Sequence, residues 1–276
     1  MPGAGQGNAD LVALKLFEGI SLRKNMIGIG NPLLSMGRVI SVSAPVPAHL
    51  PTSTVTRGRI VRVTAGLFLL CLVSAGIMVS LFYETAAAAY TARNIGFGAG
   101  VLGLSLVLLT VLYRQYAQYT APVAAMAGGV FMSGLALGFE VRVPGIAVQT
   151  VGITLAVFLS MLVLYATGAI KVTRKFLTVV YASTAAIAIV YLTGFVLILL
   201  GIPIPFLHGT GVGGMVWFSF IVILASLHLV VDFQRIANLE NTRQPDCIVW
   251  YTGLNLLVTL VWLYISVLRL IANIRR

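Results

Sequence analysis

Asp232 is the side chain with the clearest potential for chemistry, because it follows one of the longest uncharged stretches of the chain. It lies in SLHLVVDFQRI, residues 226–236, and no formally charged residue precedes it back to Lys175. A charge at the centre of a membrane-spanning helix costs about 2.5–3.5 kcal/mol, so such groups face the bundle interior or a water-filled cavity. Asp232 is therefore a candidate for an ion pathway or a proton-sensitive group. The alternative is a helix-end carboxylate paired with Arg235 at the membrane surface.

His228 precedes Asp232 by one helical turn and shares its side of the helix. A histidine beside an aspartate titrates near neutral pH. We hypothesise that the two residues form a proton-sensitive pair. The alternative is that His228 hydrogen-bonds to a serine or threonine of the bundle. A zinc site needs three or four ligands, so these two residues do not predict one.

The motifs of membrane-embedded hydrolases are missing from the sequence. It contains neither HExxH nor GxSxG. Two GxGxxG patterns, Gly98–Gly103 and Gly209–Gly214, lack the preceding strand that nucleotide binding requires. We interpret the first as close helix packing and the second as a loop. We expect no enzyme, no cofactor and no metal site.

The composition predicts which elements position these residues. Hydrophobic residues make up 59% of the chain and charged residues 9%, whereas soluble domains carry about a quarter charged residues. A bilayer-spanning helix needs about 20 apolar residues. The uncharged runs, divided at the proline- and glycine-rich segment 201–214, predict seven spans near 64–83, 94–113, 120–139, 147–167, 177–200, 213–236 and 248–270. We therefore predict an all-α integral membrane protein, a seven-helix transmembrane bundle.

Two domains are expected. Residues 63–276 form the membrane domain, and residues 1–62 form a basic N-terminal tail. The tail contains a candidate interfacial helix over 11–24 and a proline-rich linker over 41–54. Pairs of glycines four residues apart, Gly96/Gly100 and Gly134/Gly138, favour close approach of helix backbones in the bundle.

Polar side chains recur along the last predicted span at steps of three and four residues, which places them on one helical face. They are Thr252, Asn255, Thr259, Trp262, Ser266 and Arg269. In a bilayer such a face turns inward. The last helix is therefore predicted to be the central or pore-lining helix.

The net charge of +11 does not indicate nucleic-acid binding, because the cationic residues flank the spans. Most of the 18 lysines and arginines fall on one side if the N-terminus is inside. Arg269, Arg275 and Arg276 conflict with this orientation if the last helix crosses fully. Either the C-terminus lies outside despite its charge, or the last run does not cross fully.

Four segments together resemble the Bax inhibitor/YccA family of seven-span membrane proteins. They are NPLL at 31–34, PGIAVQTVGITLAVFLSMLVLYATGAIKVTRKF at 144–176, VVDFQRI at 230–236 and GLNLLVTLVWLYISVLRLI at 253–271. The resemblance implies a helical bundle around a central last helix. It also implies a calcium leak gated by pH, in which aspartates on the last two helices share a proton. Two close carboxylates cannot both ionise cheaply, and carboxylate oxygens suit calcium.

The chain keeps only part of that pattern. Asp232 matches the first aspartate, whereas Thr259 stands at the second. Ser266 stands where some bacterial relatives carry an acid, and Gly128 where the family has a glutamate on its third helix. The predicted second span contains no arginine that could act as a latch.

The resemblance predicts a pH-sensitive leak for calcium or protons, with Asp232, His228, Asn255, Thr259 and Ser266 along the pathway. The alternative is a non-conducting membrane scaffold, or an accessory subunit of a larger membrane complex, that has lost the paired acids. The expected partners are the lipid bilayer, Ca²⁺ and other membrane proteins, with no nucleic acid. A bacterial inner membrane with the N-terminus inside fits best, and the basic tail also fits an organelle inner membrane.

Overall fold

The computed structural model describes residues 52–83, 85–200 and 212–275. The expected interfacial helix over 11–24, the NPLL segment and nearly all of the linker over 41–54 lie outside these ranges. The connection that contains His208 and most of the second GxGxxG pattern also lies outside them.

The described part of the chain is almost entirely helical. Seven of its helices are long and apolar enough to cross a membrane. They are α3 (Arg57–Phe82), α4 (Ala86–Leu112), α5 (Ala117–Glu140), α6 (Ile146–Ala166), α7 (Arg174–Leu199), α9 (Val212–Leu239) and α10 (Asp246–Ile274). A short 3-10 helix, η1 (Arg114–Tyr116), precedes α5. The predicted all-α, seven-helix membrane fold is confirmed.

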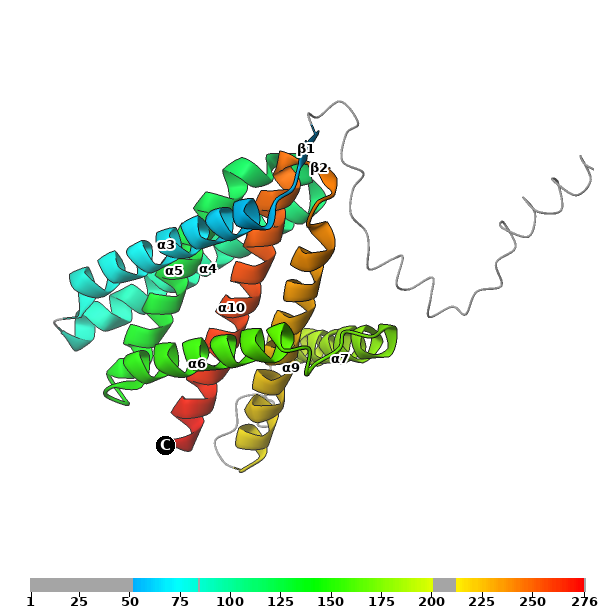
Figure 1. Cartoon of the computed structure of the whole chain (residues 1–276). Helices are drawn as coiled ribbons and strands as arrows, with labels where there is room; N and C mark the ends of the chain where they lie inside the picture. Colours follow the sequence, from blue (N-terminus) through cyan, green and yellow to red (C-terminus); the bar gives the residue numbers. More distant parts are fainter. Residues whose placement is uncertain (1–51, 84, 201–211, 276) are drawn as a thin grey trace, which may run out of the picture. The chain divides into compact units, whose positions relative to one another are not determined.

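Helix α10 lies at the centre of the bundle and packs against α3, α5, α6 and α9 (Figure 1). Leu263 and Leu268, in its second half, are fully buried. By contrast α4 packs mainly on α5, and α7 packs on α9. The outward faces of α4, α6 and α7 carry exposed apolar side chains, which suits contact with lipid. The prediction that the last helix is central is therefore confirmed.

A small sheet ties the segment before α3 to the connection between α9 and α10. Strand β1 (Thr52–Thr54) pairs antiparallel with β2 (Arg243–Pro245), with Ser53 opposite Gln244. Ser53 Oγ donates to Asp246 Oδ1 at 2.7 Å, and Arg59 Nη2 lies 2.8 Å from Asp246 Oδ2. These contacts hold the N-terminal ends of α3 and α10 together. We call this the sheet end of the bundle.

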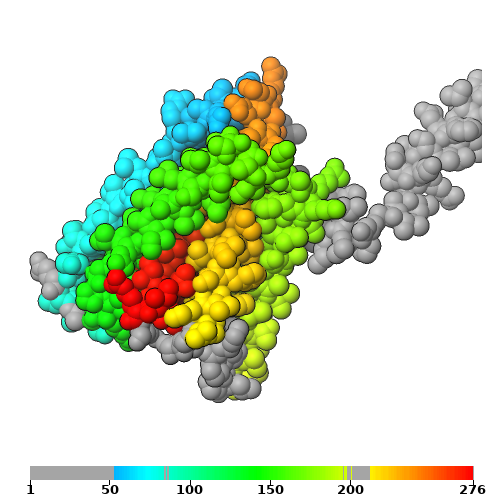
Figure 2. Space-filling model, turned by 60° about the horizontal axis from the view of Figure 1, so that its bottom comes forward, coloured from blue at the N-terminus to red at the C-terminus, as the bar shows by residue number. Residues whose placement is uncertain are grey.

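At its other end α10 reaches the turn between α5 and α6, where Arg275 Nη1 donates to the carbonyl of Pro144 at 3.4 Å. A space-filling view shows the last part of α10 (red) surfacing between α6 (green) and α9 (yellow) (Figure 2). The last hydrophobic run therefore traverses the whole bundle.

Two predicted spans begin later than the observed helices. The first was expected from 64, whereas α3 begins at Arg57. The second was expected from 94, whereas α4 begins at Ala86 and therefore includes Arg93. Both spans were delimited by their arginines. A helix does not end where a charge occurs, because long cationic side chains extend toward the membrane surface from inside a span.

Glycines bring α4 and α5 into backbone contact, as their spacing predicts. A Cβ added at Gly134 would lie 2.6 Å from the carbonyl oxygen of Ala92 and 2.9 Å from Cα of Gly96. The Gly98–Gly103 pattern lies within α4, where the Phe131 ring covers Gly100. This pattern therefore serves helix packing, as we interpreted it.

Gly134→Ala should reduce the free energy of unfolding by about 1–3 kcal/mol, because α4 and α5 must move apart to admit the methyl group. Gly98→Ala is the matched control. Its Cβ would meet no atom within 4 Å, and alanine favours a helix by about 0.5–1 kcal/mol over glycine. Unfolding titrations of the purified protein in mixed micelles would measure both. Equal effects of the two substitutions would contradict the close α4–α5 contact.

Candidate functional site

Asp232 lies on the face of α9 that packs against the central helix. Asp232 is only 4% exposed to solvent. It precedes the end of α9 by about two turns, which places it about 10 Å inside that end of the helix. Its neighbours Val231 and Phe233 are also buried. A carboxylate this well covered needs polar partners, because an unpaired buried charge is strongly destabilising.

Two side chains of α10 supply those partners. Asn255 Nδ2 donates to Asp232 Oδ1 at 2.6 Å, and Thr259 Oγ1 donates to Asp232 Oδ2 at 2.6 Å. Asn255 and Thr259 lie on successive turns of α10, so the two oxygens of one carboxylate can accept a hydrogen bond from each. Thr259 Oγ1 also lies 3.2 Å from the Asn255 carbonyl oxygen. Asp232 thereby links α9 to the centre of the bundle through both of its oxygens.

Arg235 adds a third contact from α9 itself. Its Nη1 lies 3.8 Å from Asp232 Oδ1, and its Nη2 donates to the Tyr181 hydroxyl of α7 at 3.1 Å. All three partners of Asp232 are donors, which matches an ionised carboxylate that can only accept hydrogen bonds. Asp232 is thus both paired with Arg235, as in the helix-end alternative, and buried against α10.

The structure does not pair His228 with Asp232, contrary to our hypothesis. The His228 Nε2 atom lies 2.6 Å from Thr184 Oγ1 of α7. Its ring contacts those of Tyr181 and Trp262, with centroids 5.8 and 5.4 Å apart. Residues one turn apart differ by about 40° in direction around a helix. That difference turns His228 toward α7 while Asp232 faces α10.

The rest of the polar stripe does not converge on Asp232. The hydroxyls of Thr252 and Ser266 donate to the carbonyls of Ile248 and Trp262 one turn earlier. Such hydrogen bonds satisfy a buried hydroxyl within its own helix. Ser266 lies two turns, about 10 Å, beyond Thr259. Arg269 is exposed, so the expectation that the whole stripe faces inward is wrong at its last position.

Arg93 lies inside α4, about two turns from its start, so the expectation of a second span without an arginine is wrong. Its side chain packs beside Gly138 of α5, and its guanidinium lies 5.3 Å from the centroid of the Tyr90 ring. Its Nε is buried without a hydrogen-bond partner among the described residues. The alanine run at 86–89 could have revealed it, because alanine is the strongest helix former and extends the span backward.

The site is not arranged as a cation cage. In the ranges that the structure describes, no group of three histidine, cysteine or acidic side chains could hold a metal ion. Gly128, where an acid was expected, faces α10, since its Cβ would lie 3.7 Å from Val261 Cγ2. Ca²⁺ requires six to eight oxygen ligands. Around Asp232 the amide and hydroxyl groups donate to the carboxylate instead.

Comparison with known proteins identifies one family. The family model described as "Bax inhibitor 1 like" matches residues 13–276, nearly the whole chain. No curated protein and no solved structure matches it.

Proposed function

Since the chain belongs to the Bax inhibitor 1 like family of multi-pass membrane proteins, we propose that it is a pH-sensitive leak for calcium or protons with Asp232 as its gate. The observation that carries this proposal is the carboxylate that links α9 to the central helix. Asp232 is 4% exposed and accepts hydrogen bonds from both Asn255 and Thr259.

Protonation would change what this link can do. The ionised carboxylate offers acceptors to all its partners, whereas a protonated one carries a donor on one oxygen. Thr259 can then turn its hydroxyl toward the Asn255 carbonyl, 3.2 Å away. The side-chain nitrogen of Asn255 can only donate hydrogen bonds. It therefore loses its acceptor if Oδ1 of Asp232 takes the proton. Protonation thereby weakens the α9–α10 contact and favours an open arrangement.

The groups facing Asp232 set the direction of this response. Arg235 of α9 stabilises the ionised form, and Tyr181 of α7 holds Arg235 in place. His228 lies one turn deeper, and its Nε2 is directed to Thr184 Oγ1 of α7 and not to Asp232. We therefore expect the leak to increase as the pH falls. Calcium as the transported ion would meet one carboxylate with amide and hydroxyl oxygens, a weak site that suits passage rather than storage.

Calcium flux into liposomes loaded with an indicator dye tests the proposal. The wild type should leak more at mildly acidic than at mildly alkaline pH, and Asp232→Asn should remove that dependence. Glu240→Gln, at the sheet-end terminus of α9, is the matched control and should behave as the wild type. A pH dependence that survives Asp232→Asn would reject Asp232 as the gate.

The second candidate function is a non-conducting scaffold or accessory subunit. It is favoured by Thr259, Ser266 and Gly128 at the positions where acids are expected. The same liposomes distinguish the two. A relative with both aspartates should conduct calcium, and a scaffold should conduct none at any pH. The absence of calcium flux through this protein at every pH would favour the scaffold function over the leak.

A further inference from the structure

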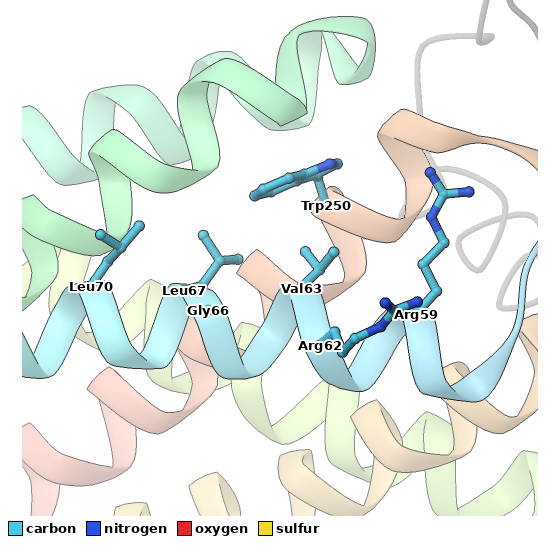
Figure 3. A pocket seen from close by; sticks show the side chains of 7 residues that line it. All are labelled: Arg59, Arg62, Val63, Gly66, Leu67, Leu70 and Trp250. Atoms are coloured by element: carbon cyan, nitrogen blue, oxygen red, sulfur yellow. The ribbon is translucent and has the colours of Figure 1, made fainter.

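A groove of about 520 Å³ lies along the sheet-end half of α3, opposite Trp250 of α10. Two kinds of side chain line it. Arg59 and Arg62 lie toward the N-terminal end of α3, and the apolar side chains continue toward Leu70, with Trp250 across from Val63 (Figure 3). The remaining lining residues are Gly66 and Leu67. The groove is therefore basic at one end and apolar along its length.

Among the described residues, the basic end carries more positive charge than neighbouring acids neutralise. Arg59 is paired with Asp246 and donates to Ser53. Arg62 is exposed, and no acid of the described residues forms an ion pair with it. The first turn of α3 begins with a further cation, Arg57, and contains no acidic residue. Cations at a helix N-terminus oppose the helix dipole, so this end of α3 favours an external anion.

The apolar part has the length and width for a hydrocarbon chain. From Arg62 to Leu70 the helix rises about 12 Å. Gly66 lies on the groove, and a Cβ built there meets no atom within 4 Å. Leu67 is fully buried and forms the wall, while Leu70 is 37% exposed. The missing side chain at Gly66 therefore leaves open space beside the helix.

We propose that this groove binds one anionic phospholipid. Its phosphate contacts Arg62 and Arg59, its glycerol region lies against Trp250, and one acyl chain follows α3 past Gly66 to Leu70. Arginine matches phosphate geometry, and tryptophan is favoured at the level of lipid headgroups. The order of charge, tryptophan and apolar surface follows the axis of a membrane-crossing helix, as a lipid does in its leaflet. This inference does not depend on whether the protein conducts ions.

Quenching of Trp250 fluorescence by brominated lipids tests the site. The full chain is reconstituted in phosphatidylcholine vesicles with increasing fractions of dibrominated phosphatidylglycerol or dibrominated phosphatidylcholine. The chain has 3 tryptophans, and the difference between the wild type and Trp250→Phe isolates the signal of Trp250 from that of Trp217 and Trp262. We expect half-quenching at a several-fold lower fraction of the anionic lipid than of the zwitterionic one.

Two substitutions address the two parts of the groove. Arg62→Gln should raise the fraction of anionic lipid needed for half-quenching about fivefold, because it removes a direct guanidinium contact to the phosphate. Arg62 is chosen because Arg59 also holds Asp246. Gly66→Leu fills the space for the chain and should raise that fraction at least as much.

Matched controls separate binding in the groove from general effects. Arg57→Gln removes the same charge from α3 outside the groove, and Gly76→Leu adds the same side chain where a Cβ also meets no atom within 4 Å. Both should leave the quenching curve within about twofold of the wild type, less than one basic residue contributes. The proposal is overturned by equal quenching by the two lipids, by equal effects of Arg57→Gln and Arg62→Gln, or by no effect of Gly66→Leu. Relief of quenching by inorganic phosphate alone would also overturn it, since a free anion would then be the occupant.

Discussion

Asp232→Ala should lower the free energy of unfolding by about 2–4 kcal/mol, because it removes two hydrogen bonds to a buried charged group. The substitution leaves the Asn255 amide without its acceptor and Arg235 without its nearest carboxylate. The loss at Thr259 is smaller, because its hydroxyl can donate to the Asn255 carbonyl oxygen instead. An unfolding titration in mixed micelles would measure the loss.

Glu240→Ala is the control, because it removes a carboxylate at the end of the same helix for which the structure shows no side-chain hydrogen bond or ion pair. Surface changes of this kind stay within about 0.5 kcal/mol. If Asp232 acted only as a surface partner of Arg235, its removal would cost at most about 1 kcal/mol. A loss that small would contradict the buried link between α9 and α10.

Thr259→Asp should make the site at Asp232 bind calcium. The Thr259 hydroxyl lies 2.6 Å from an Asp232 oxygen, so the new carboxylate would stand directly beside the old one. Two ionised carboxylates at this separation repel strongly unless a proton or a cation lies between them. The variant should therefore lose stability as the pH rises in the absence of calcium. Calcium at a hundredfold excess over its Kd should restore about 2.7 kcal/mol.

Ser266→Asp is the positional control for this experiment. It adds the same carboxylate to α10 about 10 Å further along the helix. Calcium should affect its unfolding much less, because the new group lies beyond contact with Asp232. Ser266 is buried, so the lone carboxylate also loses stability as the pH rises, and the calcium response is what distinguishes the two variants. Equal responses of the two variants would mean that the effect comes from added charge and not from the geometry at Asp232. The absence of any response in Thr259→Asp would show that positions 232 and 259 are not adjacent.

The membrane helices and the unusual position of Asp232 could be inferred from the sequence, because hydrophobicity acts locally. Uncharged runs of the length of a bilayer indicate spans wherever they occur. A single carboxylate among them is conspicuous for the same reason. The periodic polar residues of α10 also predicted its central position. The starts of α3 and α4 were misplaced, because Arg59 and Arg93 lie inside helices whose ends no local rule fixes.

The partners of each polar side chain were decided by the tertiary structure. Asp232 and His228 share a helix side, yet one bonds to Asn255 and Thr259 of α10 and the other to Thr184 of α7. Which neighbour lies on each side of α9 depends on how the helices pack, and residues far apart in the chain determine that. The sequence by itself determined a seven-helix membrane bundle and placed one acid, Asp232, near the end of its sixth span. Only the packing of α7, α9 and α10 decided that this acid is joined to the central helix, since hydrogen bonds require positions in space that periodicity does not specify.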